Sequence, residues 1–243
     1  MDMVNPRPQT EGHVFVNPVR KDSYMAMLCY KNGSLIRQKL RDEFKMSWEE
    51  FGNKLESTMP TGQLYIRFDY EEITPVLTGT WQFKVDNEKS VYEVEIEENK
   101  KIRALIETQI IAKRAHAIKV VVQLVLSFFY ESILLIRPWK FGLEKGERVI
   151  VTGGASSNKE ILRVIADVFQ LDVYINESTA NSAAMGAAYR AYYSGVKPSQ
   201  PYDKVCEKGV KLTLAAKFNP DLADHYNMMV FAYAAIEKKL LGQ

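Results

Sequence analysis

The pattern of apolar and polar positions divides the chain into a strand-rich first part and a second part where helices and strands alternate. "LYIRFDY", "TWQFKV" and "SVYEVEIEE", all within residues 13–98, have the two-residue period of half-buried strands. "HVFVNPV" and "YMAMLCYKNGSLIRQKL" add two apolar runs to this strand-rich part, and Asn32-Gly33 is a turn signal within the second. Ser47 followed three residues later by Glu50 is a capping-box pattern, which predicts a short helix over "MSWEEFGNKLE".

From Lys101 the apolar spacing becomes helical, with apolar residues at i, i+3 and i+4 through "IRALIETQIIAKRAHAIKVVVQLVLSFFYESILL". A single helix of that length is unusual in a globular domain, so we expect a break near Ala117–Val122. Next come a short buried strand "RVIVTGG", a helix "NKEILRVIADVF", a strand "LDVYIN" and a helix "NSAAMGAAYRAYYSG" that ends near Gly195. One more helix is predicted between Asp221 and Leu241. The strand–helix–strand–helix order favours an α/β layered fold.

Composition and charge narrow the class of protein. The chain has 243 residues, of which 47% are hydrophobic and 26% charged, and this is enough for one large domain or two small ones. The net charge is +2 with acidic and basic residues interleaved, so no nucleic-acid partner is expected. The apolar stretch Ile118–Ile136 is interrupted by Lys119, Gln123 and Glu131, which predicts a buried helix and no membrane partner. Residues 1–10 show no secretory signal and are expected to be flexible.

The sequence contains few side chains at the spacings typical of metal sites or catalytic nucleophiles. Cys29 and Cys206 form no CxxC pair, so we expect neither a zinc site nor a disulfide framework but buried thiols in a reducing, cytoplasmic compartment. The histidines also lack metal-ligand spacing, and His116 is interpreted as a packed or surface residue. Glu72, in "EEITP", receives no role from the sequence. No metal ligand and no catalytic residue are assigned to this chain.

The pair Gly153-Gly154 lies between a predicted strand and a predicted helix. Glycines there allow a sharp turn and a close approach of a ligand to the backbone. Ser157 and Glu160 fit S-x-x-E, which predicts Ser157 as the N-cap and Asn158 as the first helical residue. The free N–H groups of a helix start favour a ribose or phosphate. The same pair is also compatible with a simple tight connection, since neither G-x-G-x-x-G nor GxxxxGK[ST] is present.

Two further stretches resemble ligand-binding motifs but are also explained by a turn or by packing. "LTGTWQF", at residues 77–83, looks like a phosphate loop, but no helix pattern follows it and it is interpreted as a turn. The last helix of the α/β part is crowded with small residues, which predicts tight packing on its neighbours or on a ligand. These small residues are Ala180, Ala183, Ala184, Gly186, Ala187 and Ala188.

Several motifs together resemble one family. "TGGASSNKEILRVIADVF", followed by "VYI" and "ANSAAMGAAYRA", resembles the C-terminal nucleotide-binding half of the FGGY carbohydrate kinases, and within them the eukaryotic xylulose kinases. "EGHVFVNPV", "YMAMLCYKNGSLIRQKLRDEF", "SWEEF", "EEITP" and "IRALIETQIIAKRAHA" resemble the same half in the same order. The resemblance covers most of residues 11–193, and its specificity comes from the agreement of several motifs in order.

The resemblance implies an actin-like ATPase, or ribonuclease H-like, α/β fold with a mixed sheet flanked by helices. It places residues 11–243 as the C-terminal domain, which binds ATP or ADP with Mg²⁺ in a cleft. The sugar and the catalytic aspartate belong to an N-terminal domain that this chain lacks. The adenosine motif falls on Gly153, Gly154, Ala155 and Asn158, and Trp48 matches an aromatic position that lies against the nucleotide.

Three departures from the family pattern limit what the resemblance implies. The phosphate turn that precedes the stretch like "EGHVF" is missing, residues 120–147 are longer than the family's connection, and the tail after Lys197 resembles the family only weakly. The resemblance therefore implies the nucleotide-binding half of an ATP-dependent sugar kinase, inactive as an isolated chain. The alternative is a truncated relative that serves as a non-catalytic binding or interaction module.

Overall fold

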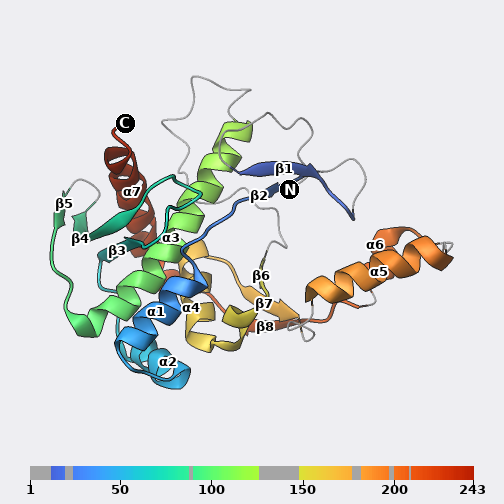
Figure 1. The fold of residues 1–243 in the computed structure, drawn as a ribbon, viewed down its shortest axis with the longest axis horizontal. Helices are drawn as coiled ribbons and strands as arrows, with labels where there is room; N and C mark the ends of the chain where they lie inside the picture. Colours follow the sequence, from blue (N-terminus) through green and yellow to red (C-terminus); the bar gives the residue numbers. More distant parts are fainter. Residues whose placement is uncertain are drawn as a thin grey trace.

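The computed structural model describes seven segments of the chain, drawn in colour in Figure 1. They are residues 12–19, 24–87, 90–125, 148–176, 182–196, 200–207 and 209–243. Residues 1–10, predicted to be flexible, lie outside the described residues, as does the part of the long connection beyond residue 125.

The strands are β1 (His13–Val16), β2 (Tyr24–Met27), β3 (Gln63–Phe68), β4 (Gly79–Asn87), β5 (Ser90–Glu93), β6 (Val149–Val151), β7 (Val173–Asn176) and β8 (Leu212–Ala216). The helices are α1 (Ser34–Glu43), α2 (Trp48–Ser57), α3 (Glu98–Val125), α4 (Lys159–Phe169), α5 (Ser182–Val196), α6 (Tyr202–Glu207) and α7 (Ala223–Leu240), with 3₁₀ turns η1 (Gly154–Ser157) and η3 (Pro220–Leu222). The strands predicted around residues 63–93 and the helices and strands predicted from residue 149 onward are confirmed in type.

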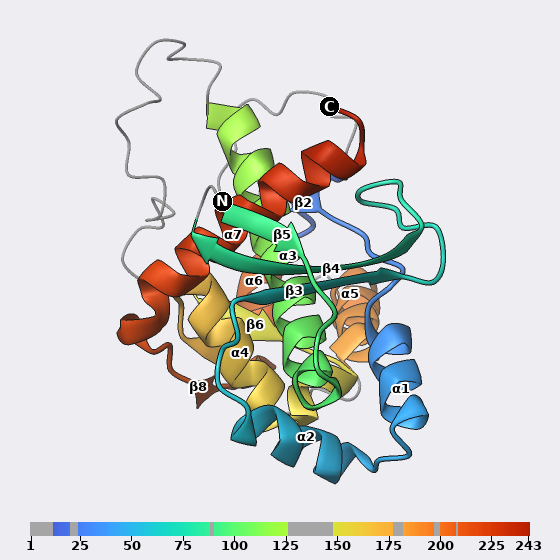
Figure 2. The same cartoon turned by 90° about the vertical axis from the view of Figure 1, so that its left-hand side faces the viewer.

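Helix α3 forms the centre of the molecule. It packs against β3 on one side and against α4 and α7 on others (Figure 2). Ile106 and Ile111 are fully buried, and so are the polar residues Glu107 and Arg114 on the same helix. The helix runs unbroken over 28 residues to Val125, so the predicted break was wrong. A helix with neighbours on several faces is stabilised by tertiary packing along its length, which explains why it needs no break.

Two small sheets flank the helical centre, and a separate hairpin pairs β1 with β2. Strands β3, β4 and β5 form an antiparallel sheet. In the other sheet β6 pairs parallel with β7, and β7 pairs antiparallel with β8. Helix α4 covers this mixed sheet, and Leu162 and Ala166 pack on Val173 and Ala216. The predicted α/β class, with a mixed sheet flanked by helices, is confirmed.

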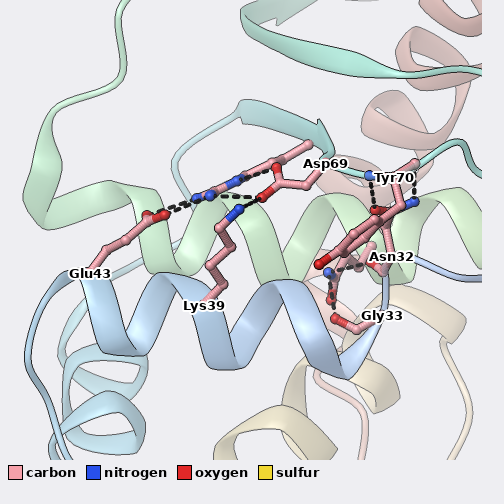
Figure 3. A network of polar contacts seen from close by, with 8 residues as sticks. Asn32, Gly33, Lys39, Glu43, Asp69 and Tyr70 are labelled. Carbon is pink, nitrogen blue, oxygen red and sulfur yellow. Dashed lines mark hydrogen bonds and ion pairs between the residues drawn. The ribbon is translucent and has the colours of Figure 1, made fainter.

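Helix α1 corrects the strand interpretation of "YMAMLCYKNGSLIRQKL". The strand ends at Met27, and residues 34–43 are helical because Ile36 and Leu40, four residues apart, form one buried stripe. Asn32 precedes the helix and is held by its side chain, whose Nδ2 donates to the carbonyl oxygen of Tyr70 at 2.8 Å and whose Oδ1 accepts from the Tyr70 amide at 3.1 Å (Figure 3). The Asn32-Gly33 turn signal therefore marks the start of a helix.

The structure confirms the prediction for His116 and contradicts the prediction for the two cysteines. His116 is a packed residue, as predicted: the Tyr30 hydroxyl lies 3.0 Å from its Nδ1, and Glu237 Oε2 lies 2.6 Å from its Nε2. Cys29 and Cys206 are unpaired but partly exposed, so the prediction that both thiols are buried was wrong. Among the described residues no helix combines the length and apolar character needed to cross a membrane.

Helix α5 also differs from its prediction. Five of the six small residues named in the prediction lie within residues 183–188, which are exposed, and Ala180 lies outside the described residues. The main packing partner of α5 is α6. Figure 1 shows α5 and α6 extending to one side of the body of the molecule. Within the described residues, the small side chains of α5 therefore do not form the predicted tight contact with a sheet.

Candidate functional site

A cleft of about 740 Å³ lies between α1, α2, η1 and the start of α4. This volume is in the range of small-molecule sites, which is roughly 300–1,000 Å³. The structure brings together in its wall three of the five residues predicted to bind nucleotide, Trp48, Gly154 and Asn158. Its lining residues are Ser34, Arg37, Trp48, Glu49, Gly52, Asn53, Glu56, Thr152, Gly154, Ser157, Asn158, Lys159, Glu160 and Ile161.

Gly153 and Gly154 form an open backbone corner at the end of β6. Gly153 has φ +78°, a left-handed conformation that side chains disfavour, and its carbonyl oxygen accepts from the Ser156 amide at 3.0 Å. A Cβ atom on either glycine would meet nothing within 4 Å. Gly154 faces the cleft, and Ala155 follows it in η1. The corner is therefore accessible to a ligand.

Asn158 caps α4, which corrects the prediction that Ser157 is the N-cap. Its Oδ1 accepts from the amides of Glu160 at 3.1 Å and Ile161 at 3.0 Å. Ser157 lies in η1 instead, and its hydroxyl donates to the carbonyl oxygen of Gly154 at 2.8 Å. With Oδ1 used by the helix, the Asn158 amide has Nδ2 left as its donor, at the wall of the cleft.

Trp48 is the first residue of α2. The predicted capping box is confirmed: Ser47 accepts from the Glu50 amide at 3.1 Å, and the Glu50 carboxylate accepts from the Ser47 amide at 2.7 Å. The Trp48 side chain is 45% exposed, with its ring edge-on to Phe51 at 5.5 Å and the Arg41 guanidinium 4.5 Å from its ring centroid. An aromatic ring this exposed is not a core anchor, and it offers the cleft a surface for stacking.

Helix α1 contributes Ser34 and Arg37 to the cleft, which the sequence did not predict as site residues. Their position depends on Glu72, whose buried carboxylate accepts from the amides of Lys31 at 2.5 Å and Asn32 at 2.8 Å. Glu72 thus fixes the loop from which α1 starts. The sequence signal was present in "EEITP", but the partners of Glu72 lie some forty residues away along the chain and could not be read from it.

Charges of both signs line the cleft. Arg37 and Lys159 bring positive charge from α1 and α4, whereas Glu49, Glu56 and Glu160 bring negative charge. Burial lowers the pKa of the Arg37 guanidinium below its ordinary value. Among the described residues no group of three histidine, cysteine or acidic side chains is placed to hold a metal ion. A magnesium ion here would depend on phosphate oxygens of a bound ligand, which is a common way for proteins to bind it.

The fold and cleft define an α/β domain of the actin-like ATPase fold, which is also found in solved sugar kinases. A xylulose kinase from Rhodospirillum rubrum aligns with 98% of this chain and 44% of its own at a TM-score of 0.71 and 16% identity. A Plasmodium falciparum glycerol kinase solved with ADP aligns with 92% of this chain and 40% of its own at a TM-score of 0.57 and 16% identity.

The sequence comparisons identify the family. The C-terminal domain of the FGGY family of carbohydrate kinases matches residues 1–195, and this chain belongs to that family. A xylulose kinase of Rattus norvegicus is 38% identical over 98% of this chain and 41% of its own length. Xylulose kinase 2 of Arabidopsis thaliana is 33% identical over 97% of this chain and 42% of its own. The chain thus spans about two fifths of the length of these relatives.

Proposed function

We propose that this chain is the nucleotide-binding half of a xylulose kinase, which transfers the terminal phosphoryl group of ATP, with Mg²⁺, to D-xylulose and forms D-xylulose 5-phosphate. The observation that carries the proposal is the meeting of Trp48, Gly154 and Asn158 in one cleft. The two motifs that hold these residues lie more than a hundred residues apart in the chain, and the family resemblance predicted both of them. The identity to rat xylulose kinase, 38% over nearly the whole chain, supports the choice of substrate.

In this proposal, the residues of this chain bind the nucleotide and orient it. The exposed ring of Trp48 stacks on the base, the bare backbone corner at Gly153-Gly154 and Ala155 lets the ribose approach, and Nδ2 of Asn158 donates to the bound nucleoside. Bound ATP supplies the phosphoryl group. Phosphoryl transfer requires positioning and charge neutralisation more than covalent chemistry from the protein, so a domain without a catalytic base can still contribute strongly.

The sugar and the catalytic base belong, in this proposal, to a further domain of the kinase. The chain spans 41% of the rat enzyme, and its cleft has no assigned base. We therefore propose that the chain of 243 residues does not phosphorylate xylulose when assayed alone. The unpaired state of Cys29 and Cys206 supports a reducing compartment such as the cytoplasm.

Titration calorimetry with ADP, and with ATP and magnesium, tests the nucleotide site. The wild-type chain should bind, and ligand at 100 times Kd should add about 2.7 kcal/mol to the free energy of unfolding. Gly154→Val should abolish binding without unfolding the chain, because a Cβ atom at this position meets nothing within 4 Å and Gly154 lines the cleft. Gly195→Val, in open space on α5, is the matched control and should bind as the wild type does.

Two outcomes would each overturn one part of the proposal, the nucleotide site or the inactivity of the isolated chain. Absence of nucleotide binding at millimolar concentration would favour the alternative, a truncated relative that serves as a binding or interaction module. Robust phosphorylation of xylulose by the isolated chain, compared with a full-length kinase as control, would show that a catalytic base lies within these 243 residues.

A further inference from the structure

A second cavity of about 510 Å³ lies between the end of α2, the loop that leads into β3, strand β4 and the first turn of α3. It shares no lining residue with the cleft described above. Helix α2 contributes to both, through Trp48, Gly52 and Glu56 in the first and through Lys54, Ser57 and Thr58 in the second. The residues that line the second cavity are Lys54, Ser57, Thr58, Met59, Pro60, Thr61, Gln63, Lys84, Asn99 and Lys100.

The residues that line this cavity carry charge of one sign, although Glu97 and Glu98 lie beside it. Three lysines from three different elements line it, Lys54 of α2, Lys84 of β4 and Lys100 of α3, and no carboxylate is among the described residues of its wall. Lys100 Nζ pairs with Glu97 Oε1 at 2.7 Å at the rim, so its charge is partly compensated. The first cleft, in contrast, mixes three glutamates with two cations. Gathering like charges around a cavity is unfavourable unless an anion occupies it.

The backbone beside the cavity holds Lys84 in place. Gly62 has φ +63°, and a Cβ atom there would lie 3.3 Å from Lys84 Nζ and 3.2 Å from the carbonyl oxygen of Val85. The glycine therefore permits both the turn and the close approach of the ammonium group. Lys84 Nζ donates to the carbonyl oxygen of Thr61 at 2.9 Å, which uses one of its three N–H groups. Its other two N–H groups have no partner in the described part of the chain and can donate to a ligand.

The wall also carries unmet polar groups. Thr61 Oγ1 and Gln63 Oε1 are both buried and have no hydrogen-bond partner among the described residues. Ser57 and Asn99 add a hydroxyl and an amide to the same wall. A buried oxygen without a partner is unfavourable. Because Thr61 and Gln63 both belong to the wall, a small shift of their side chains would let a hydroxylated ligand, or the water it orders, complete these hydrogen bonds.

We propose that this cavity binds a small phosphate monoester with a hydroxyl-bearing body, such as a phosphorylated sugar. The lysines at its wall neutralise the phosphate dianion, and the Thr61, Gln63 and Asn99 side chains contact the hydroxyl groups. The volume exceeds the need of an inorganic anion alone, which favours a larger body. Nucleotide binding in the first cleft is not required for this inference, since the two cavities share no lining residue.

Titration calorimetry of the whole chain at constant ionic strength tests the site with three probes: ribose 5-phosphate, inorganic phosphate and ribose. Ribose 5-phosphate should bind, inorganic phosphate should bind more weakly, and ribose should give no heat. Lys54→Gln, Lys84→Gln and Lys100→Gln should each weaken binding of ribose 5-phosphate about tenfold, since each removes a charge-assisted hydrogen bond. Thr61→Val, which keeps the charge, should weaken it less and should leave inorganic phosphate unchanged.

Control variants separate this site from the cleft and from general charge effects. Lys239→Gln removes one positive charge from the exposed end of α7 and should bind ribose 5-phosphate as the wild type does. Trp48→Ala should lose ADP but keep ribose 5-phosphate, whereas Lys54→Gln should do the reverse. The proposal is overturned if ribose 5-phosphate does not bind at millimolar concentration, if the folded lysine variants bind it with wild-type affinity, or if ADP competes with it.

Discussion

A Cβ atom on Gly52 of α2 would lie 3.3 Å from Nδ2 of Asn158, the residue that caps α4. The start of α4 therefore approaches α2 closely at Gly52, and the side-chain amide of Asn158 occupies the space beside this glycine. Glycine inside a helix costs about 0.5–1 kcal/mol relative to alanine. Its presence here is explained by the space that the Asn158 amide needs, and both residues line the same cleft.

Gly52→Ala should therefore weaken nucleotide binding while leaving the fold intact. The added methyl group requires the Asn158 amide to move by a few tenths of an ångström, because contacts of 3.3 Å are tighter than ordinary packing. We expect a rise in the Kd for ADP of about three- to tenfold, whereas the gain in helix propensity offsets the strain in the free energy of unfolding. Gly186→Ala, in open space on α5, is the control. Unchanged ADP affinity in Gly52→Ala would contradict the role given to Asn158.

Two substitutions of Asn158 should separate its structural role from its binding role. The substitution Asn158→Asp retains the oxygen that accepts from the amides of Glu160 and Ile161, but it puts a second oxygen in the place of the NH₂ group. Asn158→Asp should keep the wild-type free energy of unfolding, and Asn158→Ala should lose about 1 kcal/mol with the cap.

Both Asn158 variants should bind ADP at least tenfold more weakly than the wild type if Nδ2 donates to the nucleoside. Urea denaturation measures the first effect and calorimetry the second. ADP binding by Asn158→Asp with wild-type affinity would show that the amide nitrogen is not used.

Features fixed by nearby residues could be predicted from the sequence. The Ser47–Glu50 capping box, the strand before Gly153 and the amphipathic helix after it all depend on residues within a few positions of one another. The distinction between α1 and a strand was missed because its buried stripe, Ile36 and Leu40, is short. Two buried residues are too few to distinguish the helical period of 3.6 residues from the strand period of two residues. The adjacent turn signal Asn32-Gly33 does not resolve this ambiguity.

Features fixed by distant residues could not be predicted. The entry of Ser34 and Arg37 into the cleft depends on Glu72, which holds the loop before α1 from a position about forty residues further along the chain. The continuity of α3 likewise depends on β3, α4 and α7, which pack around it. Propensity and spacing did not assign a nucleotide-binding role to Trp48 and Asn158, and the resemblance to a family did.

Glu72→Ala should destabilise the chain and weaken nucleotide binding together. The substitution leaves the amides of Lys31 and Asn32 without the buried carboxylate that accepts from them, and hydrogen bonds to a charged group contribute about 1.5–3 kcal/mol each. We expect a loss of about 3 kcal/mol in the free energy of unfolding, and a rise in the Kd for ADP because the start of α1 shifts.

The neighbouring Glu71 is exposed, and Glu71→Ala is therefore the matched control, with an effect within about 0.5 kcal/mol. Denaturant titration and calorimetry on both variants measure the two effects. Loss of stability in Glu72→Ala with unchanged ADP affinity would show that the loop before α1 does not position the cleft.

A polar network between α1 and the end of β3 makes stability depend on pH (Figure 3). Arg67 donates to Asp69 at 2.8 Å and to Glu43 at 2.6 Å, and Lys39 pairs with Asp69. The hydrogen bond from Arg67 is the main cause that lowers the pKa of Asp69 from 3.8 to about 2. The ionised carboxylate of Asp69 is therefore favoured in the folded state relative to the unfolded chain.

Asp69→Asn should accordingly destabilise the chain at neutral pH but not in strong acid. The contribution of Asp69 is present above pH 3.8 and is lost as the pH falls through this value toward about 2. Because Lys39 is 51% exposed and Glu43 43%, solvent screens the network, and we expect a loss of only about 1 kcal/mol at neutral pH. Urea denaturation between about pH 7 and pH 3 should show the gap between wild type and variant closing as the pH falls. Asp42→Asn, on the exposed side of α1, is the control, and a gap for Asp69→Asn that stays constant with pH would contradict the prediction.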